Sequence, residues 1–149
     1  MRLPARLSGR VAPWAAAAAC AVAALWLASE SKRERSLERA NAAGLRADYK
    51  AAIREAGAAR TGPTTAGRAN AVQGYAWLQL GRFRDAARSF DRALRSNPSD
   101  WRLRRDLAQT LVILGDDAAA REQIRRALSL NPRMPLPGLF RRAADPDQE

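Results

Sequence analysis

The side chains that could carry out chemistry are few, and their spacing forms no catalytic set. The chain has no histidine, so it lacks both the commonest general base and the commonest metal ligand. Its carboxylates stand singly on predicted helix faces, apart from Asp116–Asp117 in a turn and Asp145 and Asp147 in the tail. None of these spacings indicates an acid/base pair or a metal-ligand cluster. We therefore predict no catalytic residue, no metal site and no cofactor.

The remaining nucleophiles lead to the same expectation. Serine and threonine hydroxyls have no histidine to activate them, and Gly62–Pro63 marks a turn rather than a phosphate-binding loop. The single cysteine, Cys20, cannot form an internal disulfide and lies in an apolar run, where we expect it to pack. The sequence predicts a protein that is not an enzyme.

The charge of the chain limits its partners. It holds 26 Lys and Arg against 15 Asp and Glu, a formal net charge of +11. Such a balance suits nucleic acid, anionic lipid or an acidic protein. The excess is spread evenly along the chain rather than gathered in one segment, which argues against a dedicated nucleic-acid patch.

The N-terminus resembles a bacterial export signal. A basic tail, residues 1–10, with Arg2, Arg6 and Arg10, precedes an uncharged apolar run over residues 11–28. At about 1.5 Å per residue the run is roughly 27 Å long, enough for a bilayer core. Trp14 and Trp26 stand near its two ends, where aromatic rings favour the membrane interface. We predict a transmembrane signal-anchor helix over residues 11–28.

Two alternatives remain for this run: a cleaved export signal, with small residues around Ala21–Ala23 and at Ala28, and an alanine-rich helix of the folded domain. Basic residues flank both sides, so their count does not decide the orientation. We expect a single pass through the bacterial cytoplasmic membrane with the C-terminal domain outside the cytoplasm.

A repeating pattern of small and apolar residues follows. Residues 75–98 read YAWLQLGRFRDAARSFDRALRSNP, which predicts two helices joined at Gly81 and a stop at Pro98. Small or apolar residues recur at intervals of 34 positions: Ala40, Gly74 and Ala108; Ala47, Gly81 and Gly115; Ala52, Ala86 and Ala120; Ala56, Phe90 and Ile124; Ala59, Ala93 and Ala127. A period of this length predicts stacked helical hairpins.

This pattern resembles the tetratricopeptide repeat, in a protein of the bacterial membrane-anchored type. The resemblance covers about residues 33–134, with units at 33–66, 67–100 and 101–134 inside a domain at 29–134. It implies an all-α fold, a short α-solenoid of helical hairpins after the N-terminal transmembrane helix. The repeat positions that it implies to be structural are Gly74, Gly81, Ala86, Phe90, Ala93, Pro98, Ala108, Gly115, Ala120, Ile124, Ala127 and Pro132.

Both ends of the repeat domain are atypical. The unit at 33–66 has Pro63 one place early and Arg60 where the other units have leucine. We regard this unit as a degenerate repeat, and the alternative is an unrelated helix pair. Residues 135–149 are expected to form a proline-rich cover and a disordered tail. In that cover Leu136, Leu139 and Phe140 would fold over the last hairpin, or else form a docking patch.

The resemblance also implies a site. In the family the first helix of each unit lines a concave groove, and the matching positions here are Arg68, Tyr75, Leu78, Gln79, Arg102, Arg105 and Gln109. Such a groove suits an acidic or carboxylate-bearing segment. The lysine and asparagine of the family's clamp for chaperone C-termini are replaced by Ala71 and Tyr75 in one unit and by Arg105 and Gln109 in the next. We do not expect a chaperone clamp.

We therefore predict a non-catalytic adaptor or assembly scaffold that is anchored in the membrane and binds a protein partner. One alternative is an exported soluble adaptor whose signal is cleaved. The other is an arginine-rich nucleic-acid-binding protein that faces the cytoplasm. The oligomeric state is not predicted.

Overall fold

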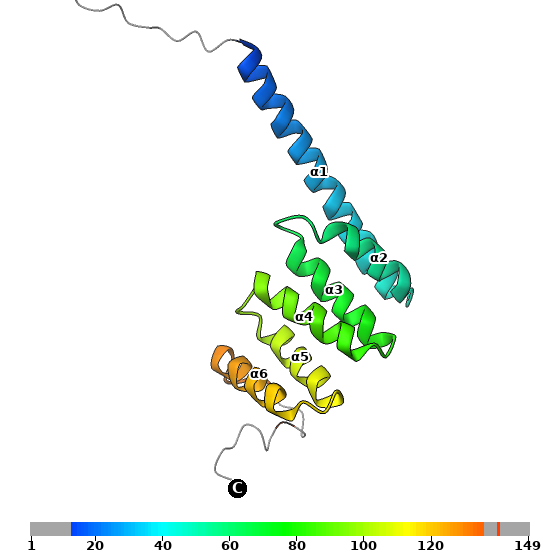
Figure 1. Cartoon of the computed structure of the whole chain (residues 1–149), viewed down its shortest axis with the longest axis vertical. Helices are drawn as coiled ribbons and strands as arrows, with labels where there is room; N and C mark the ends of the chain where they lie inside the picture. Colours follow the sequence, from blue (N-terminus) through cyan, green and yellow to red (C-terminus); the bar gives the residue numbers. More distant parts are fainter. Residues whose placement is uncertain (1–12, 136–139, 141–149) are drawn as a thin grey trace, which may run out of the picture.

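The chain folds into six helices that stack in chain order (Figure 1). The structure is a computed structural model and describes residues 13–135 and 140. Its helices are α1 (Pro13–Leu45), α2 (Tyr49–Ala59), α3 (Ala66–Gln79), α4 (Phe83–Ser96), α5 (Trp101–Ile113) and α6 (Asp117–Leu130). Each helix packs on the next one along the chain, and α1 also touches α3. The predicted all-α solenoid, preceded by a long apolar helix, is confirmed.

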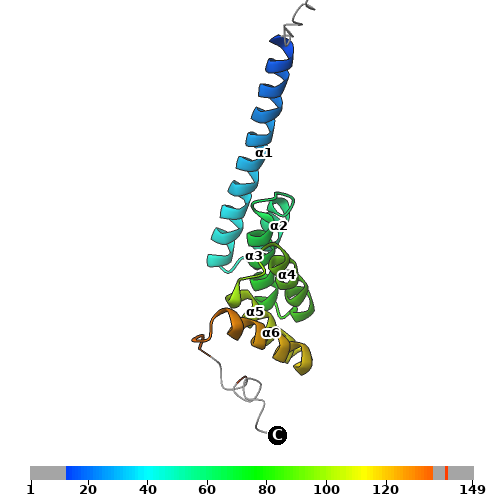
Figure 2. The same ribbon diagram turned by 90° about the vertical axis from the view of Figure 1, so that its left-hand side faces the viewer.

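Helix α1 has two halves in different surroundings. Its apolar first half projects from the stack in both views (Figures 1 and 2), and large apolar side chains such as Val22, Leu25 and Trp26 are exposed on it. From Ser29 onward α1 packs into the stack, where Leu37 and Ala40 are fully buried. No glycine or proline interrupts the chain between the halves. The apolar half is therefore a continuous extension of the first packed helix.

Three hairpins follow one another with the same packing. They pair α1 with α2, α3 with α4 and α5 with α6. Four of the five positions that recur every 34 residues are buried in all three hairpins: Ala40, Gly74 and Ala108; Ala52, Ala86 and Ala120; Ala56, Phe90 and Ile124; Ala59, Ala93 and Ala127. Where these positions hold glycine or alanine, the small residues let antiparallel helices approach closely.

The turns inside the hairpins also share one geometry. Their left-handed residues are Ala47, Gly81 and Gly115, with φ of 59°, 69° and 79°. In each turn the next residue donates its backbone N–H to a carbonyl five residues earlier, at 2.9 Å. This bond satisfies a carbonyl at the end of the first helix. Ala47 is the one non-glycine residue with positive φ in the described part of the chain, so its turn carries steric strain that glycine would avoid.

The middle hairpin shows why one small residue is required. A Cβ added to Gly74 would stand 2.5 Å from Cε1 of Phe90, and real contacts are not that short. The Phe90 ring is fully buried and fills the space that residue 74 leaves empty. It also meets Tyr75 edge-on, with ring centroids 5.0 Å apart.

The C-terminal end of the stack is closed by residues after α6. Met134 and Phe140 are buried with Ala108, Ala120 and Ile124. They cover apolar surface that the last hairpin would otherwise expose. Leu136 and Leu139, expected to share this role, lie outside the described residues.

Candidate interaction surface

Tyr75 lines two neighbouring hollows on the surface formed by the first helices of the hairpins. The hollow between α1, α2 and α3 has a volume of about 440 Å³. It is mostly apolar, and its lining includes Gly44, Leu45, Tyr49, Val72, Tyr75 and Gln79. Leu45 is 91% exposed at its rim. This hollow offers a place for an apolar side chain of a partner.

The second hollow is more polar. It lies between α3, the end of α4 and the start of α5, with a volume of about 350 Å³. Its lining includes Arg68, Ala71, Tyr75, Asp100, Arg102 and Leu103. Two of the predicted arginines are therefore brought together with Tyr75, although Asp100 adds one negative charge.

Tyr75 is held in place by the third hairpin. Its hydroxyl donates a hydrogen bond of 2.5 Å to Oδ2 of Asp106. Burial, and then this hydrogen bond, raise the pKa of Tyr75 above its ordinary value. Tyr75 is nevertheless 43% exposed, so part of its surface remains available to a partner.

The same carboxylate binds Arg105, which changes the role of this arginine. Nε and Nη2 of Arg105 donate to Oδ1 of Asp106 at 3.0 and 2.9 Å. Asp106 is only 8% exposed, so its charge needs this partner. Arg105 was predicted as a groove residue, and its charge is balanced by the neighbouring Asp106.

Arg68 and Arg102 are the more accessible predicted cations. Arg68 forms an ion pair of 2.7 Å with Glu34 of α1, and its side chain is 60% exposed. The guanidinium of Arg102 lies 4.6 Å from the centroid of the Trp101 ring and is exposed. An exposed ion pair is weak, so a carboxylate of a partner can compete with Glu34 for Arg68.

The other predicted site residues are more scattered. Gln79 lines the apolar hollow. Leu78 packs against the core cluster that contains Phe90 and Leu94. Gln109 is half-buried on α5 and is not among the residues that line either hollow.

Sequence reasoning missed the contribution of α1 to this surface. Asn41, Gly44 and Leu45 line the apolar hollow and precede Tyr75, Leu78 and Gln79 by 34 residues. The interval was therefore the signal that could have found them. The correspondence is hard to recognise because the unit at 33–66 is the degenerate one, with Arg60 and Pro63 out of pattern.

The family model of the tetratricopeptide repeat matches residues 71–135, which contain most of α3 and all of α4, α5 and α6. The hairpins and their buried small residues agree with that match. The chain contains tetratricopeptide repeats. No curated protein matches this tetratricopeptide repeat chain.

The presence of these repeats bears on the function. Tetratricopeptide repeats are protein-interaction modules, and the family is generally non-catalytic. The N-terminal helix of this tetratricopeptide repeat protein is long and apolar enough to span a membrane, a property that signal sequences share.

Proposed function

We propose that the chain is an adaptor or assembly scaffold anchored by a single pass in the bacterial cytoplasmic membrane, with its repeats outside the cytoplasm. One observation carries the proposal. Helix α1 is continuous, and its exposed apolar half joins without a break to the half that packs in the repeat stack. Exposed apolar side chains over 14–28 favour a hydrocarbon environment. Insertion of this half would hold the stack at the membrane surface.

The partner that we propose is a protein segment bearing a carboxylate, bound across the two hollows. The support is chemical. Arg68 and Arg102 line the more polar hollow, and a carboxylate accepts hydrogen bonds well from arginine. Tyr75 lines both hollows, so it can contact the same segment between its apolar and acidic parts.

We also propose that residues 33–66 act as a repeat unit. Their turn at Ala47 has the backbone geometry of the other two turns, and their small residues are buried at the same interval. Under this proposal the groove begins on α1, directly after the membrane segment.

The anchoring is tested on the full-length protein in cell membranes. Alkaline carbonate should leave an inserted protein in the membrane pellet, while protease added to spheroplasts should degrade the repeats. Release by carbonate would contradict insertion, and protection from protease until lysis would contradict the orientation. The intact mass of the mature protein separates an anchor from an exported adaptor whose signal has been cleaved.

The groove is tested by affinity capture from detergent-solubilised membranes, with the wild type and an Arg68→Glu/Arg102→Glu variant compared. A partner that depends on the groove should be lost with this variant and recovered with an Arg84→Glu/Arg121→Glu control. The control changes the charge equally at exposed positions of α4 and α6. Equal recovery with all three proteins would reject the groove as the binding surface.

A further inference from the structure

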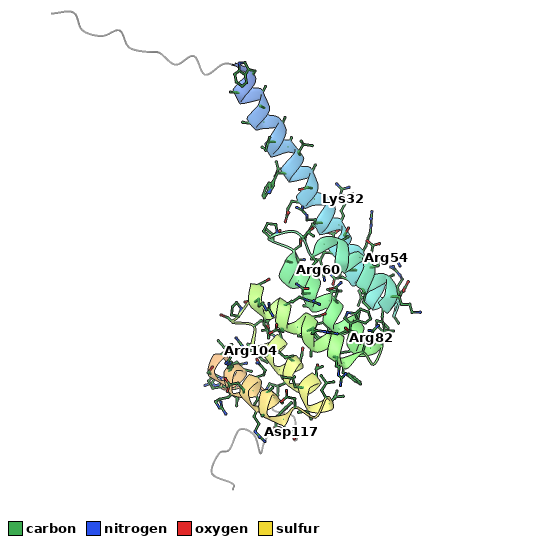
Figure 3. The ribbon with its side chains drawn as sticks, viewed as in Figure 1. Lys32, Arg54, Arg60, Arg82, Arg104 and Asp117 are labelled. Atoms are coloured by element: carbon green, nitrogen blue, oxygen red, sulfur yellow. The ribbon has the colours of Figure 1, made fainter. Side chains whose placement is uncertain are left out.

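The end of the repeat stack nearest to the exposed half of α1 carries exposed basic side chains. Lys32 and Arg35 are exposed on α1, and Arg60 is exposed directly after α2. Lys32 and Arg60 lie toward the end of the stack from which α1 projects (Figure 3). Within residues 13–135 and 140, none of the three forms a salt bridge.

Glu30 and Glu34, the two acidic side chains of α1 nearest to its exposed half, are already paired. Glu30 accepts a hydrogen bond from Thr64 and forms an ion pair of 3.0 Å with Arg33. The hydrogen bond from Thr64, together with Arg33, holds the pKa of Glu30 below its ordinary value. Glu34 is paired with Arg68. The charge that this end presents to its surroundings is therefore positive.

The loop between α2 and α3 lies at the same height along α1. Thr64 bonds Glu30, and a Cβ added to Gly62 would stand 2.7 Å from Cδ of Arg33. The backbone of the α2–α3 loop therefore lies in close contact with α1. Thr61, Pro63 and Thr64 are exposed on its outer side.

When the apolar half of α1 is inserted, the segment of α1 that contacts this loop lies in the polar headgroup layer of the bilayer. If the hydrocarbon core ends at Ala28, a rise of 1.5 Å per residue puts Glu30 about 3 Å, Lys32 about 6 Å and Arg35 about 10 Å beyond it. The headgroup layer is about 5–7 Å thick on each side, and charges act over a Debye length of about 8–10 Å. The basic side chains and the loop therefore lie within reach of lipid headgroups.

We propose that Lys32, Arg35 and Arg60, with the exposed loop residues Thr61, Pro63 and Thr64, rest on anionic phospholipid headgroups. This contact fixes the orientation of the repeat stack relative to the bilayer, which α1 alone would leave free to tilt. The inference rests on the proposed insertion of α1. Anionic headgroups are the occupant because three unpaired cations share one layer next to the membrane segment.

The test uses the full-length protein in nanodiscs of phosphatidylcholine, with or without phosphatidylglycerol. A fluorophore is attached to Thr61→Cys in a Cys20→Ser background, and its quenching by a nitroxide on the lipid headgroup is measured. We expect stronger quenching in anionic nanodiscs, and weaker quenching when salt is added. A probe at Ala118→Cys, exposed at the start of α6, should be quenched little in either lipid.

The decisive variant is Lys32→Gln/Arg35→Gln/Arg60→Gln. Each basic residue near an anionic surface contributes about 1 kcal/mol, a factor of about five in the docking equilibrium, so the enhancement by phosphatidylglycerol should be abolished. The control Arg54→Gln/Arg84→Gln/Arg121→Gln removes equal charge from α2, α4 and α6 and should retain it. Equal quenching of wild type and variant, or no effect of phosphatidylglycerol, would overturn the proposal. If α1 is not inserted, the protein fails to copurify with nanodiscs at all, which is a different outcome.

Discussion

The hydroxyl of Tyr75 and the carboxylate of Asp106 are joined by a hydrogen bond of 2.5 Å that links the second hairpin to the third. Asp106 accepts from Arg105 through its other oxygen. One buried carboxylate therefore fixes two side chains of the candidate groove. These contacts make part of that surface structural, and they separate residues that hold the stack together from residues that are free to bind.

Tyr75→Phe should remove a pH dependence of stability. Burial and the bond to Asp106 raise the pKa of Tyr75 above the value of 10.0 expected for an unperturbed tyrosine. The stability contributed by neutral Tyr75 is thus fully present below about pH 10 and is lost as the pH rises through the higher folded-state pKa. Urea unfolding between neutral and strongly alkaline pH should show a steeper loss of stability for the wild type than for Tyr75→Phe. Identical slopes for the wild type and Tyr75→Phe would contradict the prediction.

Arg105→Gln should destabilise the fold more than Arg68→Gln does. The first change leaves the buried carboxylate of Asp106 without its cation, at a cost of about 1–3 kcal/mol. The second removes an exposed ion pair with Glu34, which contributes about 0.2–1 kcal/mol. Urea denaturation of both variants measures the difference. An unchanged unfolding free energy for Arg105→Gln would show that Asp106 does not depend on this partner.

Ala47→Gly should stabilise the first hairpin. Ala47 has a φ of 59°, at the place where the other turns have Gly81 and Gly115. A left-handed conformation costs a residue with a Cβ about 1–2 kcal/mol, so glycine should raise the unfolding free energy by about 1 kcal/mol. Gly115→Ala should lower it by a similar amount. Thermal denaturation checks both changes, and a loss of stability in Ala47→Gly would exclude strain at this turn.

Gly74→Ala should be destabilising because the new Cβ would meet the Phe90 ring at 2.5 Å. Overpacking of this kind costs about 1–3 kcal/mol. Gly57→Ala is the matched control, since its Cβ would meet only Nε2 of Gln73 at 3.6 Å, and alanine favours a helix by up to about 1 kcal/mol. Adding Phe90→Leu to Gly74→Ala should recover part of the loss. Equal stability of the two single alanine variants would refute the steric argument.

Much of the fold could be predicted because its signals are local or periodic. A helix, its turn and its stop depend on residues a few positions apart, and Ala52, Ala86 and Ala120 repeat at a fixed interval. Their burial follows from that interval once hairpins stack. The apolar run over 11–28 was equally clear, since helix length and composition decide whether a segment can span a bilayer.

The candidate site was less predictable because it depends on contacts between helices. The sequence predicts Arg105 as a groove residue, but it does not specify that the guanidinium pairs with the neighbouring Asp106. The contribution of Asn41 and Leu45 required that the α1–α2 hairpin stack like the others. Side-chain pairing of this kind changes with small rotations of one helix against the next, which periodicity does not specify.

The sequence by itself determined an apolar N-terminal helix and a series of hairpins with a 34-residue interval. Only the tertiary structure decided that Tyr75 bonds Asp106 and lines two hollows, and that Thr64 ties the α2–α3 loop to Glu30. The physical reason is the range of the interactions. Helix formation and burial follow from residue types along one segment, whereas hydrogen bonds between hairpins require a particular distance and angle between packed helices.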